Sequence, residues 1–99
     1  MKVTITPAAE ADLIRIGDRI AEDNPVRARS FVQELRKATW AIGDAPRDFP
    51  LVPRHEQAGV RRRVHGDYLI FYVLTEDGVY IIHILHGAQD YERWLFPEE

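Results

Sequence analysis

The segment Val60–Leu95, VRRRVHGDYLIFYVLTEDGVYIIHILHGAQDYERWL, decides the fold that this chain is predicted to adopt. It holds three runs rich in β-branched and aromatic residues, which favour strands. The runs are separated by Gly66-Asp67 and Asp77-Gly78, and both pairs are typical of two-residue hairpin turns. Three consecutive antiparallel strands are therefore predicted, over Val60–His65, Tyr68–Thr75 and Val79–His86.

Two helices are predicted before this segment. Thr6-Pro7 and Asn24-Pro25 each place a capping side chain before a proline, which is well tolerated at the first helical position. The first helix is expected to end near Asp23 and the second at Gly43. Asp12 lies near the start of the first helix, where the helix dipole favours acidic residues. Because the link between the two helices is short, they must form an antiparallel hairpin.

These elements predict a single domain, residues 1–99, of the α+β class, in the order β-α-α-β-β-β. Lys2–Thr6 forms the first strand, and the helical hairpin packs on one face of a mostly antiparallel four-stranded sheet. Ala45–Gly59 is an ordered loop, and Asp90–Leu95 forms a short C-terminal helical turn. Tyr68–Thr75 is apolar on both faces, yet the hairpin covers only one. We therefore expect a partner chain to cover the second face, since large apolar patches are uncommon on monomers.

Composition narrows the class of protein. A hydrophobic content of 45% with 29% charged residues is typical of a soluble globular protein. No apolar run is long enough to span a bilayer, so we expect no membrane association and a cytoplasmic location. The chain contains no cysteine, which excludes disulfides, thiolate catalysis and cysteine-ligated zinc.

The charges are distributed unevenly along the chain. Residues 25–66 hold nine basic residues against four acids, a net charge of +5, whereas residues 67–99 carry −6. A surface of two signs favours a protein partner over direct, sequence-specific binding to nucleic acid. The alternative is that both blocks are simply solvated faces.

No sequence motif of a known catalytic or cofactor site is present: there is no GxSxG, HExxH, P-loop or dinucleotide fingerprint. His83 and His86 are three residues apart on a predicted strand, which places them on opposite faces and makes them a poor metal pair. We therefore expect no metal and no cofactor. Trp40 lies off the apolar stripe of the second helix, so it either packs under the following loop or anchors a partner protein.

Cleavage of RNA is a chemistry that the side chains allow. It requires a base, an acid and a cation for the phosphorane charge. His65, His83, His86 and Tyr91 carry protons that could be transferred, and the arginines of Val60–His65 carry positive charge. Alternation places Arg61, Arg63 and His65 on one face of that strand, with Val60, Arg62 and Val64 on the other. Each histidine has an alternative role as a hydrogen-bonded structural residue.

The amino-acid sequence resembles the RelE/ParE superfamily of bacterial toxins, and its ParE branch in particular. The resemblance rests on Arg61-Arg62, on GDYLIFY at Gly66–Tyr72 and on ILHGA at Ile84–Ala88, followed by Asp90. The helix start PAAEADL at Pro7–Leu13 is similar to the family as well. The likeness thus covers nearly the whole chain and implies the RelE/ParE-like fold.

The resemblance implies the toxin of a type II toxin–antitoxin system, associated with growth arrest and plasmid maintenance. Such a toxin is held in a hetero-oligomer by a ParD-like antitoxin and, when free, inhibits DNA gyrase by protein–protein contact. The RelE branch instead cleaves mRNA on the ribosome, and its catalytic residues would here be Arg61, Arg62, His83 and Tyr91. His83 and Gln89 stand where ParE-like chains commonly have arginine. A third alternative is a family member that binds its partner without being toxic.

An antitoxin would dock on the uncovered sheet face and in a groove beside the helical hairpin, as amphipathic segments commonly do. The basic middle of the chain would attract an acidic antitoxin tail. The residues expected to contact the antitoxin are Leu13, Ile16, Ile20, Phe31, Leu35, Trp40, Arg61, Arg63, Tyr68, Ile70 and Tyr72.

Overall fold

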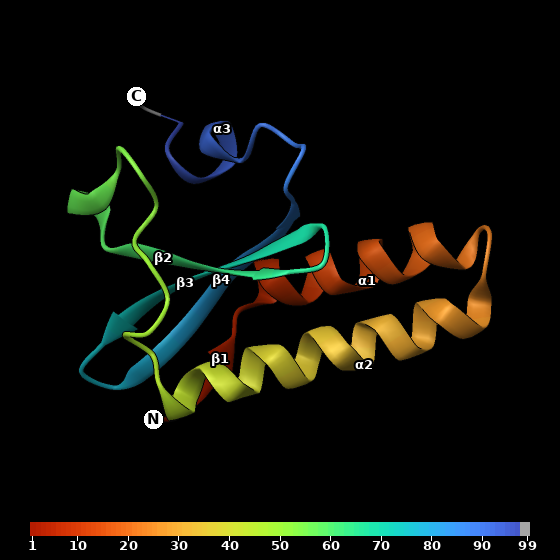
Figure 1. The fold of residues 1–99 in the computed structure, drawn as a ribbon, viewed down its shortest axis with the longest axis horizontal. Coiled ribbons are helices and arrows are strands. Elements are labelled where there is room, and N and C mark those ends of the chain that lie inside the picture. Colours follow the sequence, from red (N-terminus) through yellow and green to blue (C-terminus); the bar gives the residue numbers. More distant parts are fainter. Residues whose placement is uncertain (98–99) are drawn as a thin grey trace.

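The structure, a computed structural model, describes residues 1–97 and has the predicted α+β architecture (Figure 1). A four-stranded sheet carries a helical hairpin on one face, and a short helix follows the last strand. The elements are β1 (Val3–Ile5), α1 (Pro7–Ala21), α2 (Pro25–Ala41), the 3-10 turns η1 (Ile42–Asp44) and η2 (Glu56–Ala58), β2 (Val60–His65), β3 (Tyr68–Thr75), β4 (Gly78–His86) and α3 (Tyr91–Leu95).

Both predicted helix starts are confirmed by their capping bonds. The Thr6 hydroxyl oxygen accepts the Ala9 backbone N–H at 3.3 Å, and the Asn24 side-chain oxygen accepts that of Arg27 at 3.0 Å. The Thr6 hydroxyl also donates to the carbonyl of Ile81 at 2.6 Å, so it joins α1 to the sheet. The first helix ends at Ala21, slightly before the expected position.

The sheet has the strand order β1-β4-β3-β2, with β1 parallel to β4 and the other pairs antiparallel. β1 is so short that it pairs only with residues 79–81 of β4. The rest of β4, residues 82–86, therefore forms an open edge of the sheet. A register shift opposite Phe71 and Tyr72 bulges β4 at this point.

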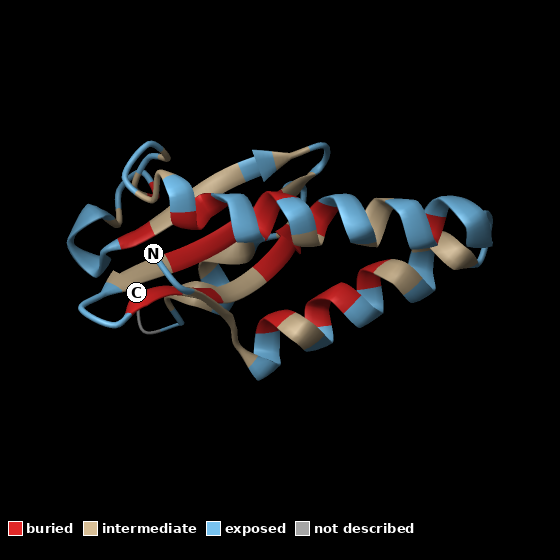
Figure 2. Cartoon of the chain, turned by 90° about the horizontal axis from the view of Figure 1, so that it is seen from below, coloured by how far each residue is buried: buried red, intermediate tan, exposed pale blue. Residues whose placement is uncertain are grey.

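The main core lies between the helical hairpin and the sheet, and Figure 2 shows the buried residues along the inner sides of both layers. Strand alternation supplies it from the sheet, where Ile70 and Tyr72 of β3 are fully buried. The buried members are Ala9, Leu13, Ile16, Leu35, Ala38, Ile42, Ile70, Tyr72, Val79, Ile81 and Ile84. The hydroxyl of Tyr72 donates to the Pro46 carbonyl at 2.6 Å, and burial raises the pKa of this phenol.

The second face of the sheet is covered by the chain itself, which corrects the expectation of a partner chain there. Leu69, Phe71 and Leu85 project from this face into a second core cluster. Val52, in the loop before β2, packs into the same cluster. The remaining cover comes from α3 and its flank, through Tyr91, Leu95 and Phe96. Figure 1 shows α3 and the loop on the side of the sheet away from the hairpin.

Within residues 1–97, none of the helices combines the length and the apolar character needed to cross a membrane.

Candidate functional site

The residues of the RNA-cleavage hypothesis do not form one cluster. Arg61 faces the helical hairpin, and its guanidinium donates to the Phe49 carbonyl at 2.7 Å. Arg62 points to the other face and donates to the hydroxyl of Tyr91 at 2.8 Å. The structure thus brings Arg62 and Tyr91 together and separates Arg61 from them by the thickness of the sheet. His65 lies on the hairpin side, where its ring centroid is 5.8 Å from that of Phe31.

At the open edge of β4, His83 is hydrogen-bonded to the carboxylate of Asp12. Only 2% of Asp12 is exposed. Its Oδ2 accepts the Ile84 backbone N–H at 2.8 Å and lies 2.9 Å from His83 Nδ1, which must donate to a carboxylate. Its other oxygen accepts from Arg15. Asp12 therefore satisfies the strand edge, a role that its place near the helix start did not predict.

His83 and His86 lie on opposite faces of the sheet, as the strand alternation predicted. In the β-ladder His83 is opposite Phe71 and His86 is opposite Tyr68. Within the described part of the chain, residues 1–97, no group of three or more histidine, cysteine, aspartate or glutamate side chains is placed to hold a metal ion.

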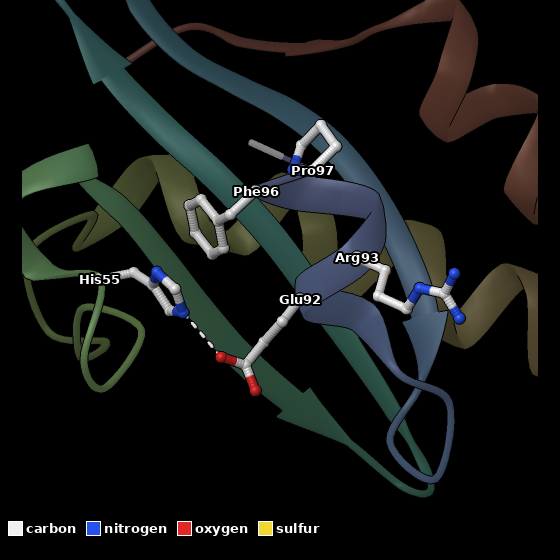
Figure 3. Close-up of a pocket in the computed structure, with 5 residues that line it drawn as sticks. All are labelled: His55, Glu92, Arg93, Phe96 and Pro97. Atoms are coloured by element: carbon white, nitrogen blue, oxygen red, sulfur yellow. Dashed lines mark hydrogen bonds and ion pairs between the residues drawn. The ribbon is translucent and has the colours of Figure 1, made fainter. Parts of the chain in front are cut away.

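A polar contact joins α3 to the loop before β2 (Figure 3). His55 Nε2 lies 2.6 Å from the carboxylate of Glu92, and the His55 ring stacks on Phe96 with centroids 4.0 Å apart. Arg54 adds an exposed ion pair to Glu92 at 3.2 Å. The hydrogen bond from His55 lowers the pKa of Glu92, and the charge of Arg54 acts in the same direction. We call the trio His55, Glu92 and Phe96 the α3 latch.

The α3 latch borders a hollow of about 410 Å³. It is lined by His55, Glu92, Arg93, Phe96 and Pro97 (Figure 3). No sequence signal marks His55 or Glu92, because they are 37 residues apart and carry no motif.

Five residues expected to contact an antitoxin belong to the main core, so burial argues against the expectation for those among them that line no pocket. Only three of them are beyond a partner's reach while the hairpin stays packed on the sheet, because Leu13 and Ile16 also line surface pockets, although each of the five is at most 6% exposed. The five residues are Leu13, Ile16, Leu35, Ile70 and Tyr72.

The other expected contact residues are accessible to different degrees and lie in separate places. Trp40 of α2 is 51% exposed, so about half of its surface is open to a partner. Phe31 and Tyr68 lie together with ring centroids 5.6 Å apart, near the tip of the hairpin where Ile20 is partly buried. Arg63 donates to the Ala38 carbonyl at 2.8 Å and is thereby tied to α2, as Arg61 is tied to the loop.

A shallow groove runs between α1 and α2, and we call it the hairpin groove. It has a volume of about 370 Å³. The helices approach closely at Gly17, where an added Cβ would lie 3.2 Å from Val32. Ile14, 58% exposed, makes the groove wall apolar. The lining residues are Leu13, Ile14, Gly17, Asp18, Ala28, Arg29, Val32, Gln33 and Arg36.

An ion pair closes one end of the hairpin groove. Arg36 of α2 binds both carboxylate oxygens of Glu10 in α1, and this hydrogen bonding lowers the pKa of Glu10. The sequence predicted a groove beside the hairpin but not Ile14, whose exposure is set by how α1 rotates on the sheet. The signal that could have found it is its position, one residue beyond Leu13 and off the buried stripe.

Comparisons with known proteins identify one family and show that its fold is shared more widely. The sequence model described as "ParE toxin of type II toxin-antitoxin system, parDE" matches residues 3–91. The fold is similar to a chain of the chromosomal ParDE TA system from P. aeruginosa, with a TM-score of 0.77 at 20% identity over 87% of this chain and 95% of that one. It is also similar to a chain of the toxin–antitoxin complex RelBE2 from Mycobacterium tuberculosis, with a TM-score of 0.62 at 21% identity over 86% and 95%. No curated protein matches. Because the family match spans nearly the whole chain, this protein belongs to the family of ParE toxins of type II toxin–antitoxin systems.

Proposed function

We propose that this chain is neutralised by a ParD-like antitoxin and that, when free, it inhibits DNA gyrase by protein–protein contact. The observation that carries the proposal is the family match over residues 3–91. ParE-like toxins are associated with gyrase, and family membership therefore makes gyrase the first target to test.

The side-chain arrangement supports a contact mechanism over cleavage of RNA. A general acid and base must lie within hydrogen-bond reach of one reacting group. Here Arg61 and Arg62 point to opposite faces, and each donates to a group of the chain itself. His83 is committed to Asp12. Cleavage would first require these bonds to be exchanged for bonds to substrate.

The hairpin groove offers an antitoxin a docking surface. Its apolar wall is flanked by Arg29, which complements an acidic amphipathic segment, whereas the charge of Arg36 is already paired with Glu10. Trp40 follows Arg36 by one helical turn on α2, so it extends the same outer surface. The expected contact residues that stay in the proposal are Ile20, Phe31, Trp40, Arg61, Arg63 and Tyr68.

The experiment that tests the proposal is a gyrase supercoiling assay with the purified toxin. The chain is co-expressed with a ParD-like protein that binds it, separated from that protein under denaturing conditions and refolded. We expect inhibition that rises with toxin concentration and is reversed when the co-expressed protein is returned in equal amount. Normal supercoiling at saturating, folded toxin would reject gyrase as the target.

The second candidate is ribosome-dependent cleavage of mRNA, and the Arg62–Tyr91 contact is the observation that favours it. A guanidinium beside a tyrosine hydroxyl could stabilise a phosphorane and donate a proton. This candidate requires mRNA cleavage in a translation extract that is lost in Arg62→Gln and in Tyr91→Phe. Intact mRNA rules it out. Normal colony counts on regulated expression would instead favour a family member that binds its partner without being toxic.

A further inference from the structure

A second pocket lies at the open edge of β4, between α1 and α3 and apart from the hairpin groove. It has a volume of about 440 Å³. Its floor is apolar, because Ile16 and Ile84 belong to the core beneath it. We call it the β4-edge pocket and define it by the rim residues Arg15, Arg19, Tyr68, His86, Gln89 and Trp94.

The rim of the β4-edge pocket is rich in hydrogen-bond donors. Arg19 is exposed and forms no ion pair with any other residue of 1–97. His86 Nδ1 accepts the Ala88 backbone N–H at 3.0 Å, so in the neutral ring the proton is on Nε2, which is left as a donor. The ring is held edge-on against Tyr68 with centroids 5.1 Å apart. Such a rim suits an oxyanion.

The charges around the β4-edge pocket favour a single carboxylate over a more highly charged anion. Arg15 also lines the pocket, but its charge is shared with Asp12. Arg19 is therefore the cation that remains to be neutralised. His86 adds a donor at Nε2, because its Nδ1 accepts the Ala88 N–H. A carboxylate carries one negative charge and matches this arrangement.

The pocket continues in two directions, which favours an extended ligand over a compact ion. Arg19, His86 and Gln89 also line an adjoining hollow of about 330 Å³. Gln89 and Trp94 line another, of about 520 Å³, on the side of α3. Trp94 is 54% exposed and offers an apolar surface between the hollows.

Two backbone groups of this edge already have partners within the chain, so side chains supply most of the recognition of a ligand. The Ile84 N–H is bound by Asp12, and the His86 carbonyl accepts the Gln89 N–H at 3.0 Å. A partner strand therefore finds these two groups occupied, and addition of a strand to the sheet is disfavoured here.

We propose that the β4-edge pocket binds an extended acidic segment of the antitoxin. One carboxylate of the segment lies against Arg19 and His86, and the apolar side chain next to it lies on Trp94. The inference rests on the proposed function in that the antitoxin is the occupant. It adds a second, side-chain-specific contact on the opposite side of α1 from the hairpin groove.

The test measures binding of a fluorescein-labelled peptide of alternating glutamate and leucine to the folded chain by anisotropy. The matched probe carries glutamine in place of each glutamate. We expect the acidic peptide to bind more tightly, and Arg19→Gln to weaken it about tenfold, the loss typical of one charge-assisted hydrogen bond. Trp94→Ala should weaken both peptides. Arg47→Gln, an equivalent change at an exposed arginine elsewhere, should leave binding unchanged, and thermal unfolding verifies that each variant is folded.

Four results would overturn the proposal. Equal losses of affinity in Arg19→Gln and Arg47→Gln would show that the acidic peptide is attracted only by the overall positive charge of the chain. Equal binding of the acidic and glutamine peptides would show that the pocket does not recognise a carboxylate. Displacement of the acidic peptide by millimolar inorganic phosphate, with no Trp94 dependence, would make the pocket a simple anion site. The readout does not involve gyrase, so Arg19-dependent binding survives if gyrase inhibition fails. If the co-expressed antitoxin binds Arg19→Gln and the unchanged chain equally, the occupant is wrong although the proposed function stands.

Discussion

Replacement of Asp12 by alanine should destabilise the protein far more than a surface substitution does. Asp12 lies in α1, where alanine is the better helix former, so helix propensity alone predicts a small gain. Its carboxylate, however, accepts the Ile84 N–H at 2.8 Å at a buried strand edge and holds His83 at 2.9 Å. Asp12→Ala leaves that backbone donor without a partner.

The magnitude follows from the bonds that are lost. A buried donor left unsatisfied costs about 1–3 kcal/mol. The Arg15 side chain is largely exposed although Asp12 is buried, so loss of this pair adds only about 0.3–0.5 kcal/mol. We therefore expect Asp12→Ala to lower the free energy of unfolding by about 2–3 kcal/mol, or Tm by roughly 10–20 °C in a domain of this size. Asp12→Asn retains an oxygen for the Ile84 N–H and should lose about 1 kcal/mol.

The assay is urea unfolding followed by circular dichroism, with Asp18→Ala as the matched control. Asp18 is an exposed residue of the same helix, so the control carries the same gain in helix propensity without the buried bonds. The dependence of the unfolding free energy on urea should stay constant across the variants if the denatured state is unchanged. A loss in Asp12→Ala within about 0.5 kcal/mol of the control would refute the edge-capping role.

Three further predictions follow from other parts of the structure. The lowered pKa of Glu92 means that its contact with His55 stabilises the fold above the ordinary value of 4.5 and is lost as the pH falls through the folded-state pKa. We therefore expect Tm to be higher for the unchanged chain than for Glu92→Gln near neutral pH. The two Tm values should converge in acid, and a difference that stays constant with pH would contradict the α3 latch. Phe71→Ala should lower the free energy of unfolding by about 3–5 kcal/mol in urea titrations, because Phe71 is fully buried on the second face; a loss below about 1 kcal/mol would mean that this face is open. Trp40→Ala should weaken antitoxin binding in calorimetry by about 2 kcal/mol if Trp40 anchors the partner, while Val64→Ala, an exposed apolar residue on the edge strand, should have no effect; equal effects would exclude Trp40 as the anchor.

The elements and their order were predictable because their signals are local. The caps at Thr6 and Asn24 act within three residues of their helix starts, and both are present in the structure. Gly66 takes the positive φ that the turn after β2 needs, with φ +59°. Alternation in β2 correctly divided Arg61 from Arg62, because the side-chain period of a strand is a property of the backbone.

The candidate site was less predictable, because it depends on which apolar faces are covered by other parts of the same chain. Leu13, Leu35 and Tyr72 were expected to meet a partner, but periodicity identifies an apolar face without saying what covers it. The second face of the sheet shows the same limit. Tyr91 and its neighbours after β4 cover that face, although such a short helix has no strong signal of its own.

The sequence by itself determined the helical hairpin and the three-stranded meander, because these follow from capping, turn chemistry and hydrophobic period over a few residues. The family came from a different signal, the resemblance of whole stretches such as Gly66–Tyr72 to ParE-like chains. Only the tertiary structure decided that Asp12 closes the edge of β4, that His55 latches α3 through Glu92, and that Arg19 and Trp94 share one pocket. These pairs lie far apart in the chain. Their contacts form because the short β1 leaves part of β4 unpaired and because α3 folds back over the sheet, and no local pattern encodes either event.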